Sequence, residues 1–230
     1  MTEFCVALAA FLAAHLVPAS RGLRTRLILL VGRTAYLTAY SILSLALLGW
    51  LIVAAQRAGT VWLWDPVPWQ WHVPFIAMPM ATFLLVAGLL SANPLSISLR
   101  GGTDPGPITA VTRHPVLWAF LIWAAAHIPP NGTVVALLLF GAMALFSLLG
   151  FILLDLKAHK RLGPERWREL AAETSILPIT ALLSGRARWN ALRRLVLPAL
   201  IATALYIWFV LQGHALLIGP DPLAGLTAMG

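Results

Sequence analysis

The sequence contains few charged residues. Only 10% of its 230 residues are Asp, Glu, Lys or Arg, whereas 60% are hydrophobic and the mean hydropathy is +0.86. A soluble domain of this length needs more charge to cover its surface. The apolar residues also form long continuous runs and do not alternate with polar ones, which favours helices over the strands of a membrane barrel. These features predict an all-α fold, a polytopic membrane helix bundle.

Several kinds of functional site are missing from the sequence. Cys5 is the one cysteine, which excludes an internal disulfide and a cysteine-based zinc or iron–sulfur site. The eight acidic residues fall in expected loops or at helix ends, whereas proton-coupled transporters usually have an ionisable residue at mid-membrane. The glycine-rich segment 101–107 lacks the spacing of a phosphate-binding loop. No nucleophile has a base at a recognisable spacing.

Six apolar segments are expected to span the membrane. They cover residues 3–18, 34–55, 71–92, 114–128, 133–154 and 195–217. The first and fourth are short, because a full span needs about 20 residues. The first is expected to be retained, since no basic residue precedes Arg21 and a signal peptide begins with a basic region. We interpret residues 1–230 as a single membrane domain.

The basic residues are distributed unevenly over the expected loops. Fifteen of the sixteen Lys and Arg residues fall on alternate loops, and Arg57 is the exception. Basic loops face the cytoplasm, so the pattern predicts a multi-pass protein with both termini on the non-cytoplasmic side. Segment 157–184 is expected to include an interfacial helix on the cytoplasmic surface. The net charge of +8 then indicates contact with membrane lipids and not with nucleic acid.

Two histidines lie inside expected spans. His15 and His127 each follow small residues and precede a proline. A histidine within a span usually faces the interior of the bundle, where it either makes an interhelical hydrogen bond or ligates the iron of a haem. The second ring nitrogen then needs a partner, for which we expect carbonyls freed by Pro18 and Pro130. The remaining histidines outside the next motif, His72, His159 and His214, are expected to need no special role.

Arg113 and His114 stand together at the cytoplasmic mouth of the fourth span. With Arg100 nearby, they can hold an anion such as a phosphate, a carboxylate or a haem propionate. The alternative is that they anchor the helix at the membrane interface.

A series of motifs in a fixed order resembles the NnrU family of bacterial membrane proteins. The motifs are Ala14-His15-Leu16-Val17-Pro18, Gly22-Leu23-Arg24, Leu63-Trp64-Asp65-Pro66, Asn93-Pro94, Thr112-Arg113-His114-Pro115, Trp118, Trp123-Ala124-Ala125-Ala126-His127, Asn131-Gly132, Thr174-Ser175, Pro178 and Gly185-Arg186. The resemblance implies a role in the expression or function of nitric oxide reductase in denitrification. The same domain is similar to that of zeta-carotene isomerase, a membrane enzyme that uses haem b.

The resemblance to the isomerase implies particular site residues. Its two histidine ligands of the haem iron correspond to His15 and His127. Because these two positions are offset in depth by roughly 12 Å along their helices, His114 with His15 is the alternative pair. The position of an exchangeable cysteine ligand is occupied by Ala124, which argues against ligand switching. The resemblance thus implies a haem b-binding accessory or redox-linked protein of a bacterial inner membrane, whose partner is nitric oxide reductase or its assembly machinery.

Two other functions remain as alternatives. One is a haem-dependent isomerase acting on a lipophilic polyene. The other is a membrane methyltransferase of the isoprenylcysteine carboxyl type, which Arg113-His114-Pro115 and Gly163-Pro164-Glu165-Arg166-Trp167 resemble. That enzyme family carries a Glu-Glu pair before the glycine, but Lys157-Ala158-His159-Lys160 stands here.

Overall fold

The computed structural model describes residues 1–16 and 21–224, which are helical apart from turns and loops. The described residues form no β-strand, and one isolated bridge joins Trp62 to Thr133. The chain divides into two compact units. The first comprises Met1–Trp64 with Thr133–Leu139, and the second comprises Asp65–Gly132 with Phe140–Gly230.

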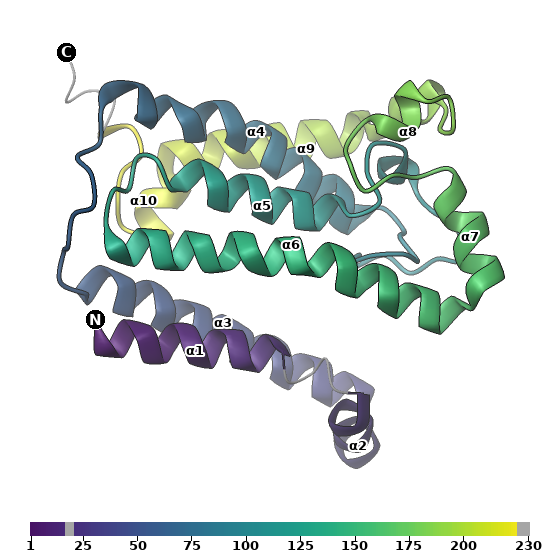
Figure 1. Ribbon diagram of the computed structural model, residues 1–230, viewed down its shortest axis with the longest axis horizontal. Helices are drawn as coiled ribbons and strands as arrows, with labels where there is room; N and C mark the ends of the chain where they lie inside the picture. The colour runs from purple at the N-terminus through teal and green to yellow at the C-terminus, as the bar shows by residue number, and fades with distance from the viewer. Residues whose placement is uncertain (17–20, 225–230) are drawn as a thin grey trace. The chain divides into compact units, whose positions relative to one another are not determined.

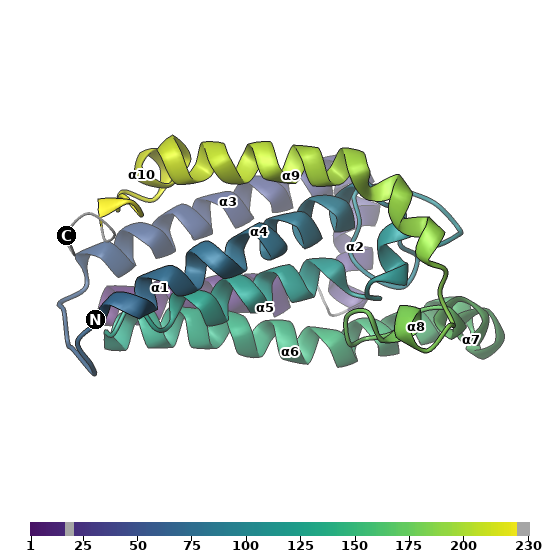
Figure 2. The ribbon, with the colours of Figure 1, turned by 90° about the horizontal axis from the view of Figure 1, so that it is seen from above.

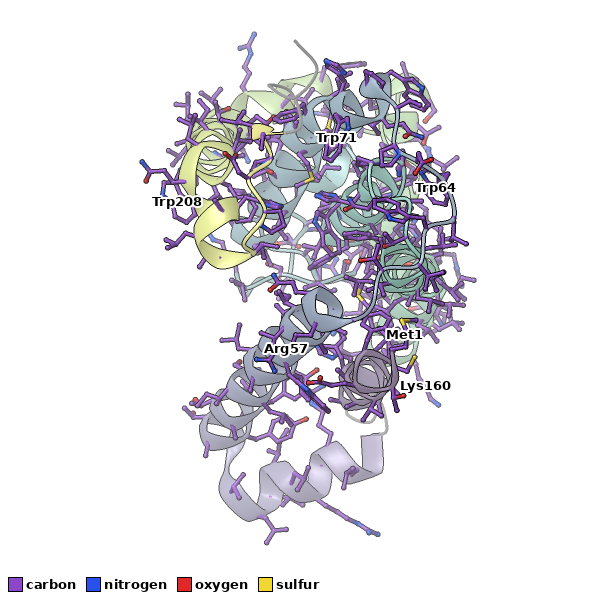
Figure 3. All side chains as sticks on the ribbon, turned by 90° about the vertical axis from the view of Figure 1, so that its left-hand side faces the viewer. Met1, Arg57, Trp64, Trp71, Lys160 and Trp208 are labelled. Carbon is purple, nitrogen blue, oxygen red and sulfur yellow. The ribbon has the colours of Figure 1, made fainter. Side chains whose placement is uncertain are left out.

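The first unit is a helical hairpin with a short helix in its connection. Helix α1 (Thr2–Leu16) packs against α3 (Arg33–Arg57), and Met1 and Arg57 lie at the same end of the pair (Figure 3). The core consists of Phe4, Ala7, Leu51, Ala54 and Val135. Small residues among them let the helix backbones approach closely.

The connection between α1 and α3 is not the simple loop that the sequence predicts. It contains helix α2 (Arg21–Val31). The next residue, Gly32, has a φ of 82°. Glycine adopts this left-handed conformation without steric cost and so separates α2 from α3. Arginines interrupt the apolar residues of α2, which is why hydropathy alone does not detect the helix.

The second unit contains a bundle of α4 (Pro68–Leu90), α5 (Pro115–His127), α6 (Val134–Leu162, from Phe140 onward) and α9 (Val196–Trp208). Helix α4 packs against both α5 and α9, as Figures 1 and 2 show. The core between them includes Leu84, Ala87, Ile108, Ala119 and Leu195. The α4–α5 contact depends on Gly88, where a Cβ atom would lie 2.9 Å from the Pro115 ring.

Helix lengths and composition identify an integral membrane protein. Four helical segments are long and apolar enough to cross a membrane, namely Arg33–Arg57, Pro68–Leu90, Val134–Leu162 and Trp189–Leu217. Two shorter apolar helices, Thr2–His15 and Pro115–His127, correspond to the expected first and fourth spans. The predicted all-α membrane helix bundle is therefore confirmed, including the shortness of these two helices.

Several helix boundaries differ from the sequence-based ones. The fifth expected span does not end at residue 154, because α6 continues to Leu162. The sixth begins with a 3-10 turn, η3 (Trp189–Leu195), and after α9 it passes through a π-helical turn, η4 (Phe209–Gly213), into α10 (His214–Leu217). The expected surface segment 157–184 contains the end of α6, then α7 (Pro164–Ala172) and α8 (Thr180–Leu183). Its position relative to a membrane stays a prediction.

Candidate functional site

In the second unit, Arg113 and His114 both contact the carboxylate of Asp155. His114 precedes α5, and Pro115 occupies the first helical position, where its missing N–H costs little. Asp155 lies inside α6. Its Oδ2 atom accepts a hydrogen bond from Arg113 Nη1 at 2.5 Å, and its Oδ1 atom accepts one from His114 Nε2 at 3.1 Å. The anion beside the predicted cationic pair is therefore a side chain of the protein itself.

Arg113 also ties the start of α5 to the segment after α7. Its Nε atom donates to Thr174 Oγ1 at 2.9 Å, and its backbone N–H donates to the carbonyl of Ser175 at 2.7 Å. The guanidinium lies over the ring of Trp167, 5.4 Å from the ring centroid, a favourable cation–π geometry. These contacts make Arg113 a buried structural link between α5, α6 and α7.

His114 is fully buried, and both of its ring nitrogens are hydrogen-bonded. Because the carboxylate of Asp155 only accepts, Nε2 carries the hydrogen, and Nδ1 faces Ser96 Oγ at 2.9 Å. Ser96, His114 and Asp155 thus form the kind of chain used in nucleophilic catalysis, an arrangement that sequence spacing did not reveal. None of the three residues lines either cavity described below. The hydrogen bonds join the segment after α4, the start of α5 and the interior of α6.

A polar cavity of about 520 Å³ lies at the same end of the second unit. Its charged lining residues are Asp104, Arg166, Glu169, Glu173, Arg188 and Arg194. Hydrogen bonds from Arg166 to Glu169 and Asp104 raise the pKa of the arginine above its ordinary value. Since the lining carries three acidic and three basic residues, it favours no single class of ligand.

An apolar cavity of about 530 Å³ lies among α4, α5, α9 and the chain around α10. Aromatic side chains dominate its lining: Trp71, Phe75, Phe120, Trp123, Phe140, Tyr206, Trp208 and Phe209. Figure 3 labels two of these residues, Trp71 on α4 and Trp208 at the end of α9. The volume lies within the range of pockets for small ligands and cofactors, about 300–1,000 Å³.

His127 contributes an imidazole to the wall of the apolar cavity. Its Nδ1–H donates to the carbonyl of Trp123, four residues earlier, at 2.7 Å. The ring packs against Trp123 and Phe140, with centroid distances of 5.7 and 5.1 Å. Nε2 has no hydrogen-bond partner among the described residues, so its lone pair is available to a ligand.

The prediction of which carbonyl accepts the hydrogen bond of His127 is wrong. We expected a carbonyl freed by Pro130, but the imidazole bonds to Trp123 instead, because a side chain on a helix easily reaches the carbonyl one turn earlier. His15 does the same with Phe11, at 2.7 Å. Pro18, the other expected source of a free carbonyl, lies outside the described residues.

His15 belongs to the first unit and His127 to the second. The second nitrogen of His15, Nε2, accepts a hydrogen bond from Ser44 Oγ at 3.0 Å. Each half of the predicted ligand pair is thus described within its own unit, and the pairing itself stays a prediction. His72 and His159 are both exposed and do not line the apolar cavity.

His214 is a further lining residue of the apolar cavity. The sequence predicts no special role for His214, because it lies near the end of an apolar helix. Among the described residues, no group of three or more His, Cys, Asp or Glu side chains is placed to hold a metal ion. A metal here would need a scaffold of its own, such as a porphyrin, with imidazoles completing its coordination.

Comparison with known families bears on the whole chain. A sequence model described as NnrU protein matches residues 3–222. The chain belongs to the NnrU family. No curated protein and no solved structure matches it. The resemblance based on the ordered motifs is therefore confirmed at the level of the family, and the NnrU domain covers α1 through the residues after α10.

In this NnrU-family chain, two motifs of the resemblance have different surroundings. Arg113 and His114 are engaged with Asp155 and face neither cavity. The motif that ends in His127 faces the apolar cavity with an unpartnered Nε2. Ala124, which the expected resemblance to the isomerase places at the cysteine position, is fully buried and does not line the cavity. Of these residues, only His127 offers an electron pair to a bound cofactor.

Proposed function

We propose that this NnrU-family protein binds haem b in the apolar cavity of its second unit, with His127 as an axial ligand, and that it supports nitric oxide reductase in denitrification. The observation that carries the proposal is the imidazole of His127. It lies on the wall of an apolar, aromatic cavity with Nδ1 held by a backbone carbonyl and Nε2 unpartnered.

The residues of the cavity fit a haem in three respects. The volume of about 530 Å³ suits a cofactor of this size class. The aromatic lining matches an apolar macrocycle and excludes water. The hydrogen bond to the Trp123 carbonyl fixes the orientation of the imidazole and makes Nε2 a better ligand, as partners of metal-binding histidines do. A bound haem would supply a redox-active iron whose properties depend on its axial ligands.

We do not propose that Arg113 and His114 anchor a haem propionate. Their N–H groups are directed at Asp155, at distances of 2.5 and 3.1 Å. An external anion would have to displace that carboxylate. The contacts support a structural role instead, in which the cluster holds α5, and therefore His127 at its far end, against α6.

The link to denitrification rests on the family resemblance and on the location in a membrane. We propose nitric oxide reductase or its assembly machinery as the partner. We also propose a bacterial inner membrane with the basic end of the second unit in the cytoplasm, because all Lys and Arg of that unit lie in segments 100–113 and 157–194.

A second candidate function is a haem-dependent isomerase acting on a lipophilic polyene. The apolar cavity favours it, since the lining consists mainly of aromatic and aliphatic side chains open to molecules dissolved in lipid. The buried Ala124 disfavours any mechanism that needs a thiol ligand at that position. The contacts of the described residues lend no support to a methyltransferase.

Two measurements test the proposed function. Protein purified in detergent after expression with ample haem should give the pyridine haemochrome of b-type haem. A denitrifying host that lacks this protein should lose nitric oxide reductase activity and regain it when the wild-type chain is supplied. Purified protein with no haem would refute the cofactor. Unchanged nitric oxide reductase activity in the deletion strain would refute the link to denitrification.

A further inference from the structure

The apolar cavity contains a second histidine whose surroundings resemble those of His127. His214 Nδ1–H donates to the carbonyl of Pro220 at 2.6 Å, just as His127 Nδ1–H donates to Trp123. Both imidazoles line the same cavity. Both residues lie in the second unit, so the structure describes them within one compact body.

The backbone bonds decide which nitrogen of each ring is available. A carbonyl only accepts, so Nδ1 carries the hydrogen in both rings, and the neutral imidazole then has its lone pair on Nε2. Neither Nε2 has a hydrogen-bond partner among the described residues. A ligand that fits this pair must accept electron density from two nitrogens, as a metal ion or a hydrogen-bond donor does and an anion does not.

A local distortion of the last helix lies immediately before His214. The π-helical turn η4 immediately precedes it, and turns of this type occur frequently at functional sites. Phe209 in η4 contacts the imidazole edge-on at a centroid distance of 5.5 Å. Gly213 permits the close packing of η4, since a Cβ atom there would lie 2.8 Å from the Trp208 ring. The extra residue per turn changes the direction in which side chain 214 leaves the helix.

His15, the other candidate partner, is in a different situation. Its Nε2 accepts a hydrogen bond from Ser44 Oγ, and both residues belong to the first unit. Ligation through that nitrogen would require the Ser44 bond to break. His214 requires no such exchange.

We propose that His214 is the second axial ligand of the haem and that it forms a bis-imidazole site with His127. The inference rests on the proposed function, because it presupposes that the cavity binds haem. It replaces His15 as the partner of His127. Two strong-field imidazole ligands give six-coordinate, low-spin iron, which is a feature of electron-transfer haems and leaves no open position for a substrate on the metal.

The test is the spin state of the purified haem protein and of three variants. Wild-type protein should be six-coordinate and low-spin by absorption and electron paramagnetic resonance spectroscopy. His214→Gly should become five-coordinate and high-spin, and added imidazole should restore the low-spin spectrum by filling the space of the missing ring. His15→Ala should keep the wild-type spectrum. His72→Ala is the matched control, because its Nδ1–H also bonds to a carbonyl, that of Pro68, outside the cavity.

The outcomes separate the two proposals. Absence of haem in the wild-type protein overturns the proposed function and this inference together. A haem-containing wild type whose spectrum changes in His15→Ala and not in His214→Gly overturns this inference alone. If His214→Gly does not fold, His214→Met provides the test, since a thioether is also an axial ligand. That variant should remain six-coordinate with a shifted spectrum, and an unshifted spectrum would count against His214.

Discussion

Asp155 of α6 accepts a hydrogen bond at 2.5 Å from Nη1 of Arg113, which precedes α5 and lies 42 positions earlier in the chain. The same carboxylate accepts a second hydrogen bond from His114. This contact fastens the start of α5 to α6, and α5 ends at His127 in the wall of the apolar cavity. We therefore expect the cluster to position the proposed haem site without contacting the haem.

Replacing Asp155 should destabilise the second unit. In Asp155→Asn the buried guanidinium of Arg113 loses its counterion, and removing one partner of a buried ion pair costs about 3–5 kcal/mol. Because the Asp155 side chain is 17% exposed, we expect the lower end of that range. Thermal unfolding in detergent, followed by size-exclusion chromatography, measures the effect.

Asp104→Asn is the matched control for Asp155→Asn. It removes an ion pair with Arg166 in which the two side chains are 35% and 81% exposed, and an exposed pair contributes little to stability. Its melting temperature should stay close to that of the wild type. An equal decrease in melting temperature in the two variants would contradict a larger stabilising effect of the Arg113–Asp155 ion pair.

Gly213→Ala should disturb the apolar cavity. The new Cβ atom would lie 2.8 Å from Trp208 and 2.9 Å from Phe209, and both rings line the cavity. Such overpacking typically costs about 1–3 kcal/mol. We expect a lower melting temperature and a lower content of haem per protein.

Gly141→Ala provides the comparison for Gly213→Ala. A Cβ atom at Gly141 on α6 would meet no described atom within 4 Å outside the backbone of its own helix. Alanine is also the better helix former, by about 1 kcal/mol. This variant should be as stable as the wild type or more stable. A loss of haem in Gly141→Ala as large as that in Gly213→Ala would refute the packing argument.

Labelling of introduced cysteines should establish the sidedness. In a Cys5→Ser background, Lys160→Cys is expected on the cytoplasmic side and Asp65→Cys on the opposite side. A membrane-impermeant maleimide added to spheroplasts should therefore label Asp65→Cys, and it should label Lys160→Cys only after permeabilisation. The reverse pattern would invert the proposed topology.

The sequence predicts the membrane helices well because hydropathy is a local property. The expected spans at 34–55 and 71–92 differ by only a few residues from α3 and α4. The predicted span ends at residue 154 because Asp155 interrupts the apolar run. Helix α6 nevertheless continues to Leu162, and Asp155 within it pairs with Arg113.

The candidate site is harder to predict because its parts are distant in the sequence. His127 is identifiable from its small neighbours and its family motif. The contribution of His214 depends on a π-helical turn and on a carbonyl six residues later, at Pro220. Neither feature has a sequence signature, and the cavity exists only after α4, α5 and α9 have packed.

The haem content of His127→Ala tests the central claim most directly. The ratio of b-type haem to purified protein is measured by pyridine haemochrome for the wild type, His127→Ala and His72→Ala. We predict about one haem per chain in the wild type and in His72→Ala, and a severalfold lower ratio in folded, monodisperse His127→Ala, because an axial ligand provides much of the affinity. A wild type without haem, or a His127→Ala protein with the wild-type ratio and an unchanged spectrum, would contradict the account.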